Sequence, residues 1–270
     1  MKFIDTHAHL NFQDFQGEEE SLQEKLSSNE ITVINVGIDK FSSGQVVELA
    51  QKYENYFAII GLHPISTVIT REDDYILGET FGYEFFKMLI LTNKKIVGIG
   101  ECGFDYVHNP RSSQEVQEKA FRAQIELALE MDLPLMLHLR PSQNTYDAYE
   151  EALVILREYK ERNPNLRGQA HFFSGTEKIA QEFIELGFYI SFTGVITFAP
   201  YDELVASIPM NRILSETDSP YAAPVPHRGK RNESSYVVEV VNKMAEIYQV
   251  PIDTMSQQII QNAKKLYRLG

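Results

Sequence analysis

The chain has 270 residues, of which 43% are hydrophobic and 23% charged, and its formal net charge is −13. This composition is ordinary for a soluble globular protein, and the length allows one or two domains, although α/β barrels of about 250 residues often form a single domain. The acidic balance argues against a broad nonspecific grip on duplex DNA, which needs a basic face. It leaves room for a phosphate-bearing substrate held in one small cationic pocket.

Three features of the sequence favour a cytoplasmic protein. No apolar stretch reaches the length of about 18 residues that spans a bilayer. The first residues, MKFIDTHAHL, lead directly into a strand-like segment and show no cleavable signal pattern. Cys102 is the only cysteine, so no internal disulfide can form. We therefore expect an intracellular, cytoplasmic protein without a membrane segment.

Short apolar runs alternate with longer segments of helical spacing along the whole chain. Clear helical segments are SSQEVQEKAFRAQIELALEMD (112–132) and YDAYEEALVILREYKERN (146–163). Candidate capping boxes pair Ser112 with Glu115 and Ser174 with Glu177, and Gly187 lies where a helix C′ residue belongs. The strand candidates are residues 2–7, 31–37, 56–64, 95–103, 133–140, 168–173, 188–194 and 212–220.

This alternation predicts βαβ units and a parallel sheet. Eight strands fit a closed (β/α)8 TIM barrel, while a doubly wound open sheet shows the same alternation and stays open as the alternative. No linker rich in Gly, Pro or Ser divides the chain. We therefore predict one α/β domain over residues 1–270.

Histidines and carboxylates recur where the apolar runs end. The first run, FIDTHAHLNF, contains His7 and His9 at i and i+2, so both side chains project to the same side of an extended segment. In a parallel barrel the carboxyl ends of all strands surround one rim, where the active sites of this fold are built. A single histidine there is usually a satisfied core residue, but five of the seven histidines share this position. The residues at the run ends are His7, His9, His63, Glu101, His138, His171, Glu216 and Asp218.

This set of side chains indicates a metal centre. Imidazole and carboxylate groups bind Zn, Mn, Fe and related divalent ions. The candidate ligands are too many for one tetrahedral ion, so two ions that share a carboxylate are the economical arrangement. Such a pair clamps the attacking and leaving oxygens of a hydrolysis and generates hydroxide at neutral pH. Asp218 is the candidate general base, because a carboxylate beside a bound water accepts its proton.

The order and spacing of several motifs resemble the TatD family of metal-dependent hydrolases from end to end. The motifs are FIDTHAHL, GLHP, GIGECGFDY, FRAQIELALEMDLPLMLHLR, HFFSG, YISFTG and ETDSPYAAPVPHRGKRNE. The family is similar to the wider amidohydrolase barrels, so the resemblance implies an amidohydrolase-like TIM barrel. Its usual activity is divalent-metal-dependent cleavage of DNA phosphodiesters. The resemblance therefore implies a deoxyribonuclease that takes DNA ends or single strands and holds two divalent ions.

The resemblance also implies roles for individual residues at the metal centre. The ligands implied for one ion are His7, His9, Glu101 and Asp218. Those implied for the second ion are Glu101, His138 and His171, so that Glu101 bridges the two. Glu101 and Asp218 are then the catalytic carboxylates.

The segment PVPHRGKRNE (224–233), which we call the basic loop, gathers cationic side chains in an otherwise acidic chain. An arbitrary charge run is usually a solvated loop, but this one follows Asp218 directly, which favours phosphate contact. Arginine binds phosphate in a bidentate manner and lysine supplies a point charge. The motif match implies phosphate contacts at His63, Arg140, Arg228 and Lys230, with Asn232 and Glu233 shaping the loop and Asn232 counted as a further substrate-binding residue.

The chain departs from the family pattern at three places. Pro141 follows Arg140 where the family often has an acidic residue, and Ser234 replaces the proline that ends the RNEP motif. The segment from Arg71 to Lys94 is longer and more aromatic than the resemblance leads us to expect. None of these departures touches a proposed ligand, but they leave the substrate preference open.

The glycines of GIGECG formally match the dinucleotide fingerprint GxGxxG. That fingerprint requires its last glycine to open a helix, whereas FDYVHNPRSS intervenes here. We therefore predict no nucleotide cofactor, and we expect Gly98 and Gly100 to relieve crowding within a barrel strand.

Other nucleophile and ligand candidates are weaker. Alternation along a strand places Cys102 on the face opposite Glu101, which predicts a buried and inert thiol. No GxSxG elbow is present, so the usual serine-hydrolase signature is missing. His108 belongs to none of the motifs, and we interpret it as a surface residue.

Two functional classes remain after this comparison of motifs. The first is a metal-dependent phosphodiesterase acting on DNA, which the basic loop favours. The second is a hydrolase of a carboxylic ester, amide or lactone that uses the same centre, which the acidic surface and the departures keep open. A noncatalytic binding module is disfavoured because the ligand set is complete. The histidine-rich set suits Zn or Mn, whereas the family resemblance points to Mg, and nothing in the sequence indicates the oligomeric state.

Overall fold

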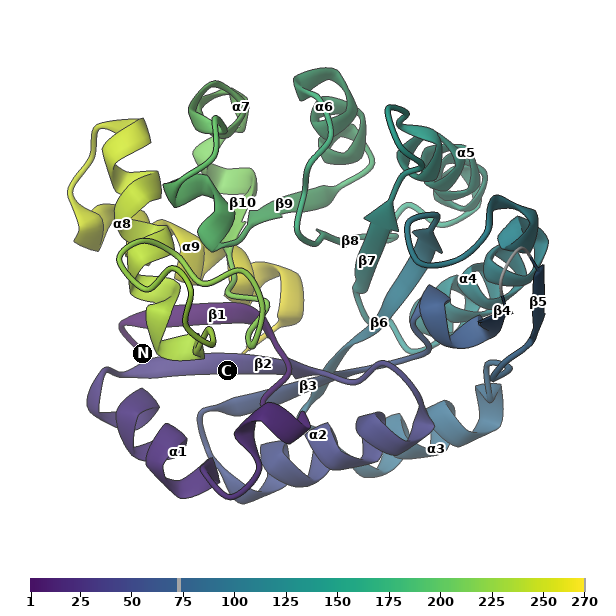
Figure 1. Cartoon of the computed structure of the whole chain (residues 1–270), viewed down its shortest axis with the longest axis horizontal. Coiled ribbons are helices and arrows are strands. Elements are labelled where there is room, and N and C mark those ends of the chain that lie inside the picture. The colour runs from purple at the N-terminus through teal and green to yellow at the C-terminus, as the bar shows by residue number, and fades with distance from the viewer. Residues whose placement is uncertain (72–73, 270) are drawn as a thin grey trace.

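Eight parallel strands of the computed structural model form one sheet that curves into a barrel, and the helices lie outside it (Figure 1). The structure describes residues 1–71 and 74–269. Neighbouring strands of the sheet follow one another in chain order, so the predicted (β/α)8 barrel and its strands are confirmed. The strands are β1 (Phe3–Ala8), β2 (Ile31–Val36), β3 (Tyr56–Ile60), β6 (Ile96–Asp105), β7 (Leu135–Arg140), β8 (Gly168–Ala170), β9 (Phe188–Phe192) and β10 (Ile213–Ser215).

The helices follow the strands in the order expected of βα units. A short antiparallel hairpin, β4 (Val68–Arg71) with β5 (Asp74–Leu77), precedes α3 in the connection between β3 and β6. This connection is the segment that departs from the family pattern, and its residues 72 and 73 lie outside the described part. The helices are α1 (Glu19–Ser28), α2 (Lys40–Lys52), α3 (Tyr83–Thr92), α4 (Gln114–Glu130), α5 (Asp147–Arg162), α6 (Glu177–Glu185), α7 (Asp202–Ser207), α8 (Val237–Tyr248) and α9 (Ile252–Tyr267).

The sheet closes between its first and last strands through a seam, formed by β1 with β10 and residues 216–219. Side chains bridge the lower part of the seam: Thr6 Oγ1 donates to the Ser215 carbonyl at 3.0 Å, and Ser215 Oγ donates to the Ile4 carbonyl at 3.0 Å. Backbone bonds close the upper part, where the Asp218 N–H donates to the His7 carbonyl at 2.9 Å. These bonds distinguish a closed barrel from the open doubly wound alternative.

The barrel strands are covered on both faces, which explains why they read as continuous apolar runs in the sequence. Every residue of β1, β2, β6 and β9 is buried. Aromatic side chains fill the layer around the sheet, among them Phe104, Phe121, Phe173, Phe183, Phe188 and Phe192. One hydrophobic cluster therefore runs through the described chain, and the single-domain organisation over residues 1–270 stays a prediction.

A buried set of polar side chains, which we call the interior polar network, lies inside the barrel. Gln169 Nε2 and Ser191 Oγ each donate to Glu216 Oε2 at 2.8 Å. The Tyr267 hydroxyl, near the end of α9, donates to Gln169 Oε1 at 2.7 Å. Buried polar groups require such partners, because an unpaired one costs the full desolvation penalty. The network thus connects the last helix to a carboxylate near the rim.

Two expectations about helix starts are wrong, and one about a helix end is confirmed. Helix α4 begins at Gln114 after a 3-10 turn, and no side chain caps it, so the Ser112 box does not form. Helix α6 is capped by Thr176, whose Oγ1 accepts from the Ile179 N–H. The N-cap therefore lies two residues after Ser174, and the Ser174 box does not form. Gly187 follows α6 with φ of +94°, as a C′ glycine should.

Candidate metal centre

The six proposed metal ligands lie together at the carboxyl ends of the barrel strands. His7 and His138 are near the ends of β1 and β7, and Glu101 lies in the last half of β6. His9 and His171 directly follow β1 and β8, and Asp218 lies three residues after the end of β10. The side chains come from segments more than 200 residues apart, yet all six residues are buried: His7, His9, Glu101, His138, His171 and Asp218.

One cluster of four ligand atoms surrounds a point between β1, β6 and the end of β10. His7 Nε2 and His9 Nε2 lie 3.1 Å apart. Both nitrogens lie 3.4 Å from Glu101 Oε1 and 3.5 Å from Asp218 Oδ1. Ligands about 2.1 Å from a tetrahedral ion are about 3.4 Å from one another. The measured separations therefore match those of a four-ligand divalent site.

A second cluster faces the other oxygen of Glu101. His138 Nδ1 lies 3.1 Å and His171 Nε2 lies 3.4 Å from Glu101 Oε2. The remaining ring nitrogens donate to carboxylates, His138 Nε2–H to Asp105 at 3.0 Å and His171 Nδ1–H to Glu216 at 3.2 Å. Carboxylates behind ligating histidines fix the ring orientation and raise ligand basicity. Glu101 therefore presents one oxygen to each cluster, as a bridging carboxylate must.

The proton position on His9 is also fixed. Its Nδ1 lies 2.9 Å from the Val36 carbonyl, which can only accept, so Nδ1 carries a proton and Nε2 of the neutral ring has a free lone pair. That lone pair points into the first cluster. His7 Nδ1, in contrast, is buried and has no hydrogen-bond partner among the described residues.

The pKa values of two of the buried ligands shift in opposite directions from their ordinary values. Burial lowers the pKa of His7, but the charges of Glu101 and Asp218 outweigh it and raise this pKa to about 9. Burial raises the pKa of Glu101, but the charges of His7 and His171 and the bond from His138 hold it well below its ordinary range. Crowded carboxylates thus retain their charge only with positive partners. Divalent ions satisfy that requirement, so the donor set fits divalent metal ions.

His63 reaches the same region but carries its proton on the other nitrogen. The Ile65 N–H donates to His63 Nδ1 at 3.0 Å, so the neutral ring has its proton on Nε2. Burial, reinforced by the charge of His138, holds the pKa of His63 well below its ordinary value. Nε2 lies 3.8 Å from Glu101 Oε2. This N–H is a donor aimed into the centre, which suits contact with a substrate oxygen better than metal ligation.

The clusters form the floor of a pocket of about 440 Å³. Arg140 is the one Arg or Lys that lines it within the described chain. Its Cζ lies 4.2 Å from the centroid of the Phe172 ring, and no other described residue forms an ion pair or hydrogen bond with the guanidinium. Phe12 and Tyr221 complete the wall near His9. The pocket therefore combines an unpaired cation with the donor of His63.

The basic loop lies outside this pocket. Arg228 stacks over Phe198, with Cζ 3.8 Å from the ring centroid, and donates to the Ala223 carbonyl at 3.1 Å. Arg231 pairs with Glu18 at 2.7 Å and with Glu233 at 3.3 Å, so its charge is neutralised locally. Substrate contact by Arg228, and by Lys230 in the same loop, stays a prediction.

Asn232 is corrected from substrate contact to support of the loop. Its residue is fully buried, and its Nδ2 donates to the Thr217 carbonyl at 2.9 Å and the Tyr221 carbonyl at 2.6 Å. Its Oδ1 accepts from the Glu233 N–H at 2.9 Å. All of its polar atoms therefore hold the backbone around Asp218, and none faces the pocket.

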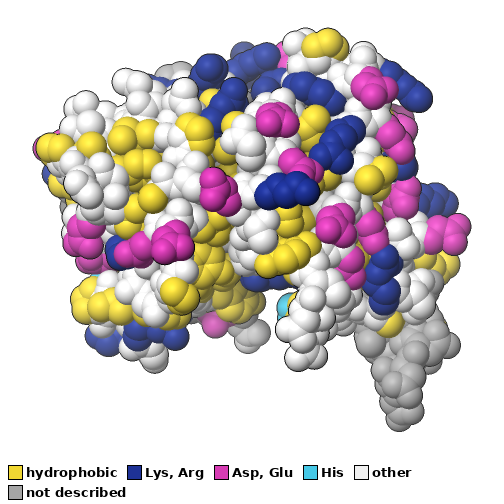
Figure 2. Space-filling model, turned by 90° about the horizontal axis from the view of Figure 1, so that it is seen from above, with side chains coloured by type: hydrophobic (Ala, Val, Ile, Leu, Met, Phe, Trp, Pro, Cys, Tyr) yellow, Lys and Arg dark blue, Asp and Glu magenta, His cyan; other side chains and the backbone are white. Residues whose placement is uncertain are grey.

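The surface carries no broad basic band on the side shown in Figure 2. Basic and acidic side chains are interspersed on the described part of that face, and a histidine is visible in a hollow at its lower edge. This distribution agrees with the acidic balance of the sequence. A polyanion would thus be bound locally, at the pocket.

The expectation that Gly98 and Gly100 relieve crowding is confirmed. A Cβ on Gly100 would lie 2.4 Å from the Met136 carbonyl, and one on Gly98 would lie 3.0 Å from Ile59, so both positions relieve crowding inside the barrel. Cys102 is fully buried, its Sγ lies 3.5 Å from the same Met136 carbonyl, and burial raises the pKa of its thiol well above the ordinary value. The thiol is therefore inert, as predicted.

Sequence reasoning missed the groups that support the ligands. Asp105 holds His138 and also accepts from the ring and backbone of His108, at 2.8 Å each. His108 is exposed, as expected, and it pairs with Asp105. Asp5 accepts from the hydroxyl of Thr217 at 2.6 Å and so ties β1 to the residue before Asp218. Asp105 is an even number of residues from Glu101, and Asp5 is an even number from His7. Even spacing along an extended strand places side chains on the same face, which was the signal available in the sequence for both carboxylates.

Three comparisons place this geometry among known proteins. The family model TatD related DNase matches residues 4–268. The metal-dependent hydrolase YabD of Bacillus subtilis, itself uncharacterized, is 35% identical over 272 residues, covering 99% of each chain. The similarly uncharacterized metal-dependent hydrolase YcfH of Escherichia coli is 29% identical over 276 residues, covering 100% of this chain and 97% of YcfH. The crystal structure of YjjV, a TatD homologue of Escherichia coli, superposes with a TM-score of 0.86 at 26% identity and covers 100% of this chain and 99% of its own.

No helix of the described residues has both the length and the apolarity needed to cross a membrane. The match to the family model runs over nearly the whole barrel and includes every proposed ligand. The chain therefore belongs to the TatD family and is a metal-dependent hydrolase.

Proposed function

We propose that the protein is a two-metal phosphodiesterase that cleaves DNA at ends or in single strands. The observation that carries this proposal is the pairing of Arg140 with His63 across the ligand clusters. Both present N–H donors to one pocket, and neither donor group has an anionic partner within hydrogen-bond distance among the described residues. An arginine fork and a neutral imidazole N–H match the non-bridging oxygens of a phosphodiester.

The nucleic-acid class is supported by the family to which the chain belongs, whose model describes DNases. The acidic net charge favours an end or a single strand over a duplex as the substrate. A duplex requires many phosphate contacts along a basic face, whereas an end or a single strand can present one phosphodiester to a local site. We therefore assign the pocket to an accessible strand.

Bound divalent ions would place positive charge on the phosphate oxygens and make an attacking water more acidic. The protein's own groups do the rest. Burial raises the pKa of Asp218, but the charges of His171 and His7 outweigh it and lower this pKa, so the carboxylate is held ionised. Its carboxylate takes the proton of the attacking water. His63 and Arg140 hold the phosphate oxygens in place as negative charge develops on them.

The ligand set favours some divalent metals over others. Four imidazoles and two carboxylates suit Zn or Mn, while Mg prefers oxygen ligands. The spacing of the first cluster, 3.1–3.5 Å between ligand atoms, favours a four-coordinate ion. We therefore propose Zn or Mn ahead of Mg for the ion held by His7 and His9.

The test is nuclease kinetics on a short single-stranded oligonucleotide with Mg, Mn or Zn and with a chelator. We expect metal-dependent cleavage that the chelator abolishes and that Glu101→Gln lacks. Carboxylic esters and lactones are assayed in parallel. Turnover of an ester or lactone, with no phosphodiester cleaved under any metal, would refute the proposal and assign the centre to carboxyl chemistry.

A further inference from the structure

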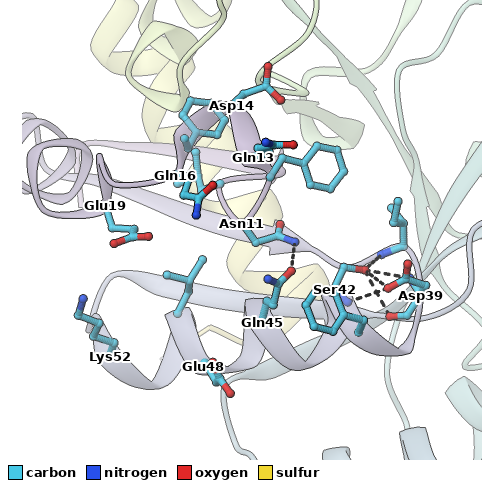
Figure 3. A pocket seen from close by; sticks show the side chains of 16 residues that line it. Asn11, Gln13, Asp14, Gln16, Glu19, Asp39, Ser42, Gln45, Glu48 and Lys52 are labelled. Carbon is cyan, nitrogen blue, oxygen red and sulfur yellow. Dashed lines mark hydrogen bonds between the residues drawn. The ribbon is translucent and has the colours of Figure 1, made fainter.

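A second hollow adjoins the metal centre and has no role in the chemistry above. We call it the α2 groove: it lies between residues 10–16 and helix α2 and has a volume of about 870 Å³ (Figure 3). Both of its walls begin at the rim, since residues 10–16 follow β1 and α2 follows β2. The groove therefore starts on the same face of the barrel as the proposed ligands.

The α2 groove is continuous with the metal pocket. Phe12 and Ile38 line both cavities. The Phe12 ring stacks on His9, with centroids 4.5 Å apart and planes at 13°. One aromatic ring thus separates a proposed ligand from the groove, so a molecule bound in both places would span about one nucleotide.

The charge of the groove excludes phosphate as its occupant. Four carboxylates line it, those of Asp14, Glu19, Asp39 and Glu48, against the single ammonium group of Lys52. Like charges without counterions repel a phosphodiester backbone. A strand cleaved at the metal centre would keep its phosphates on the side of Arg140 and could turn only an uncharged group into the groove.

The remaining lining is suited to a flat, polar ring. Phe41, in the first turn of α2, is 76% exposed, although burying such a side chain is favourable. Asn11 Nδ2 donates to Gln45 Oε1 at 3.3 Å across the groove (Figure 3). Asn11 Oδ1 and Gln45 Nε2 have no partner among the described residues, which leaves one acceptor and one donor side by side. Aromatic faces stack bases, and side-chain amides pair with base edges.

We infer that the α2 groove binds one unpaired nucleobase of the substrate strand, next to the scissile phosphate. This inference rests on the proposed phosphodiesterase function and adds a base-binding subsite to it. Phe12 and Phe41 stack the base, and the amides of Asn11 and Gln45 contact its edge. Such a subsite explains how a protein with an acidic net charge could select a single strand, because a paired base is not available to enter the groove.

The experiment uses a short single-stranded oligonucleotide and a series in which one abasic residue replaces each nucleotide in turn. The wild-type protein should lose about tenfold in kcat/KM when the abasic residue lies next to the scissile phosphate, the loss expected for one stacked base, and less than about twofold elsewhere. Phe41→Ala should lose about tenfold on the intact strand and be indifferent to that abasic residue. Gln45→Ala should change the preference among the four bases at the same position.

The matched control is Phe85→Ala, which removes another exposed phenylalanine, 41% exposed in the first turn of α3 and outside both cavities. It should behave as wild type on every substrate. Equal cleavage of all abasic substrates by wild type would overturn the base subsite and leave the phosphodiesterase standing. Equal losses by Phe41→Ala on intact and abasic strands would also overturn it. Inhibition by spermidine that Phe41→Ala removes, with no abasic effect, would assign the groove to a cation instead. Absence of any phosphodiester cleavage would refute the proposed function itself.

Discussion

Divalent ions should stabilise the fold as well as serve its chemistry, because their proposed ligands lie on both sides of the barrel seam. His7 and His9 belong to β1 and its end, while Asp218 follows β10. An ion bound only by the folded state adds stability by mass action. Removal of the metal with a chelator is therefore the perturbation, and the thermal unfolding temperature is the quantity that responds.

The size of the effect follows from the two clusters. At a free concentration one hundred times its Kd, each ion adds about 2.7 kcal/mol to the free energy of unfolding. The unfolding entropy of about 2.1 cal/mol/K per residue gives about 0.6 kcal/mol/K for this chain, so each ion raises Tm by about 5 °C. Two ions should raise Tm by about 10 °C, less if the ions also bind the unfolded chain.

The assay is differential scanning calorimetry of chelator-treated protein with and without added Mn or Zn, combined with metal analysis. Glu101→Gln keeps the size of the side chain but removes the carboxylate that faces both clusters at 3.1–3.4 Å. Its metal-induced rise in Tm should fall below about 2 °C. Cys102→Ser is the control next in the chain, on the opposite face, and should show the wild-type rise even if its starting Tm is lower.

Binding of two ions and the full rise in Tm by Glu101→Gln would contradict the bridging role of Glu101. Loss of the rise in Cys102→Ser would contradict it too, because the faces of β6 would then be assigned wrongly. A rise of about 5 °C with one equivalent of tightly bound metal would correct the number of ions to one.

Four further substitutions test the roles of single residues. Asp218→Asn at saturating metal should lower kcat by about 10²–10⁴-fold with little change in KM, because it removes the proton acceptor and spares the phosphate contacts; steady-state kinetics measures the split. Glu216→Gln removes the negative charge of the group that accepts from the His171 Nδ1–H and should weaken binding of the second ion by about 10–100-fold, as measured by metal titration. Arg140→Ala should raise KM for phosphodiesters and reduce the slope of log KM against log salt by about one, whereas Arg228→Ala should raise KM only for strands that extend beyond the pocket.

The fold and the ligands were predictable for the same reason. Parallel strands read as separate apolar runs, and the barrel brings their carboxyl ends to one rim, so His138 and His171 could be placed beside His7 from order alone. That two ions share a carboxylate followed from having more ligands than one ion needs, whereas Glu101 was named as the bridge by the family resemblance. Its two oxygens, facing separate clusters, agree with that expectation.

The parts that could not be predicted depend on contacts through space. Nothing in the sequence links Tyr267 with Gln169, which are 98 residues apart, or indicates that Glu216 supports His171. Asn232 was misread because a polar residue in a basic loop resembles a ligand-binding residue, whereas the loop needs its amide internally. The α2 groove was not foreseen, since it is formed between two segments that are individually unremarkable.

The seam has a consequence for the folding of the protein during its synthesis on the ribosome. Translation delivers His7 near the start and Asp218 near the end, and the backbone bond between them closes the barrel only when both exist. Until β10 is released, β1 and β9 are open edges of a growing parallel sheet, the kind of edge that recruits other chains. The first ion cannot have its full ligand set during that interval. A chain that stops before residue 213 should therefore bind less metal and be prone to aggregation.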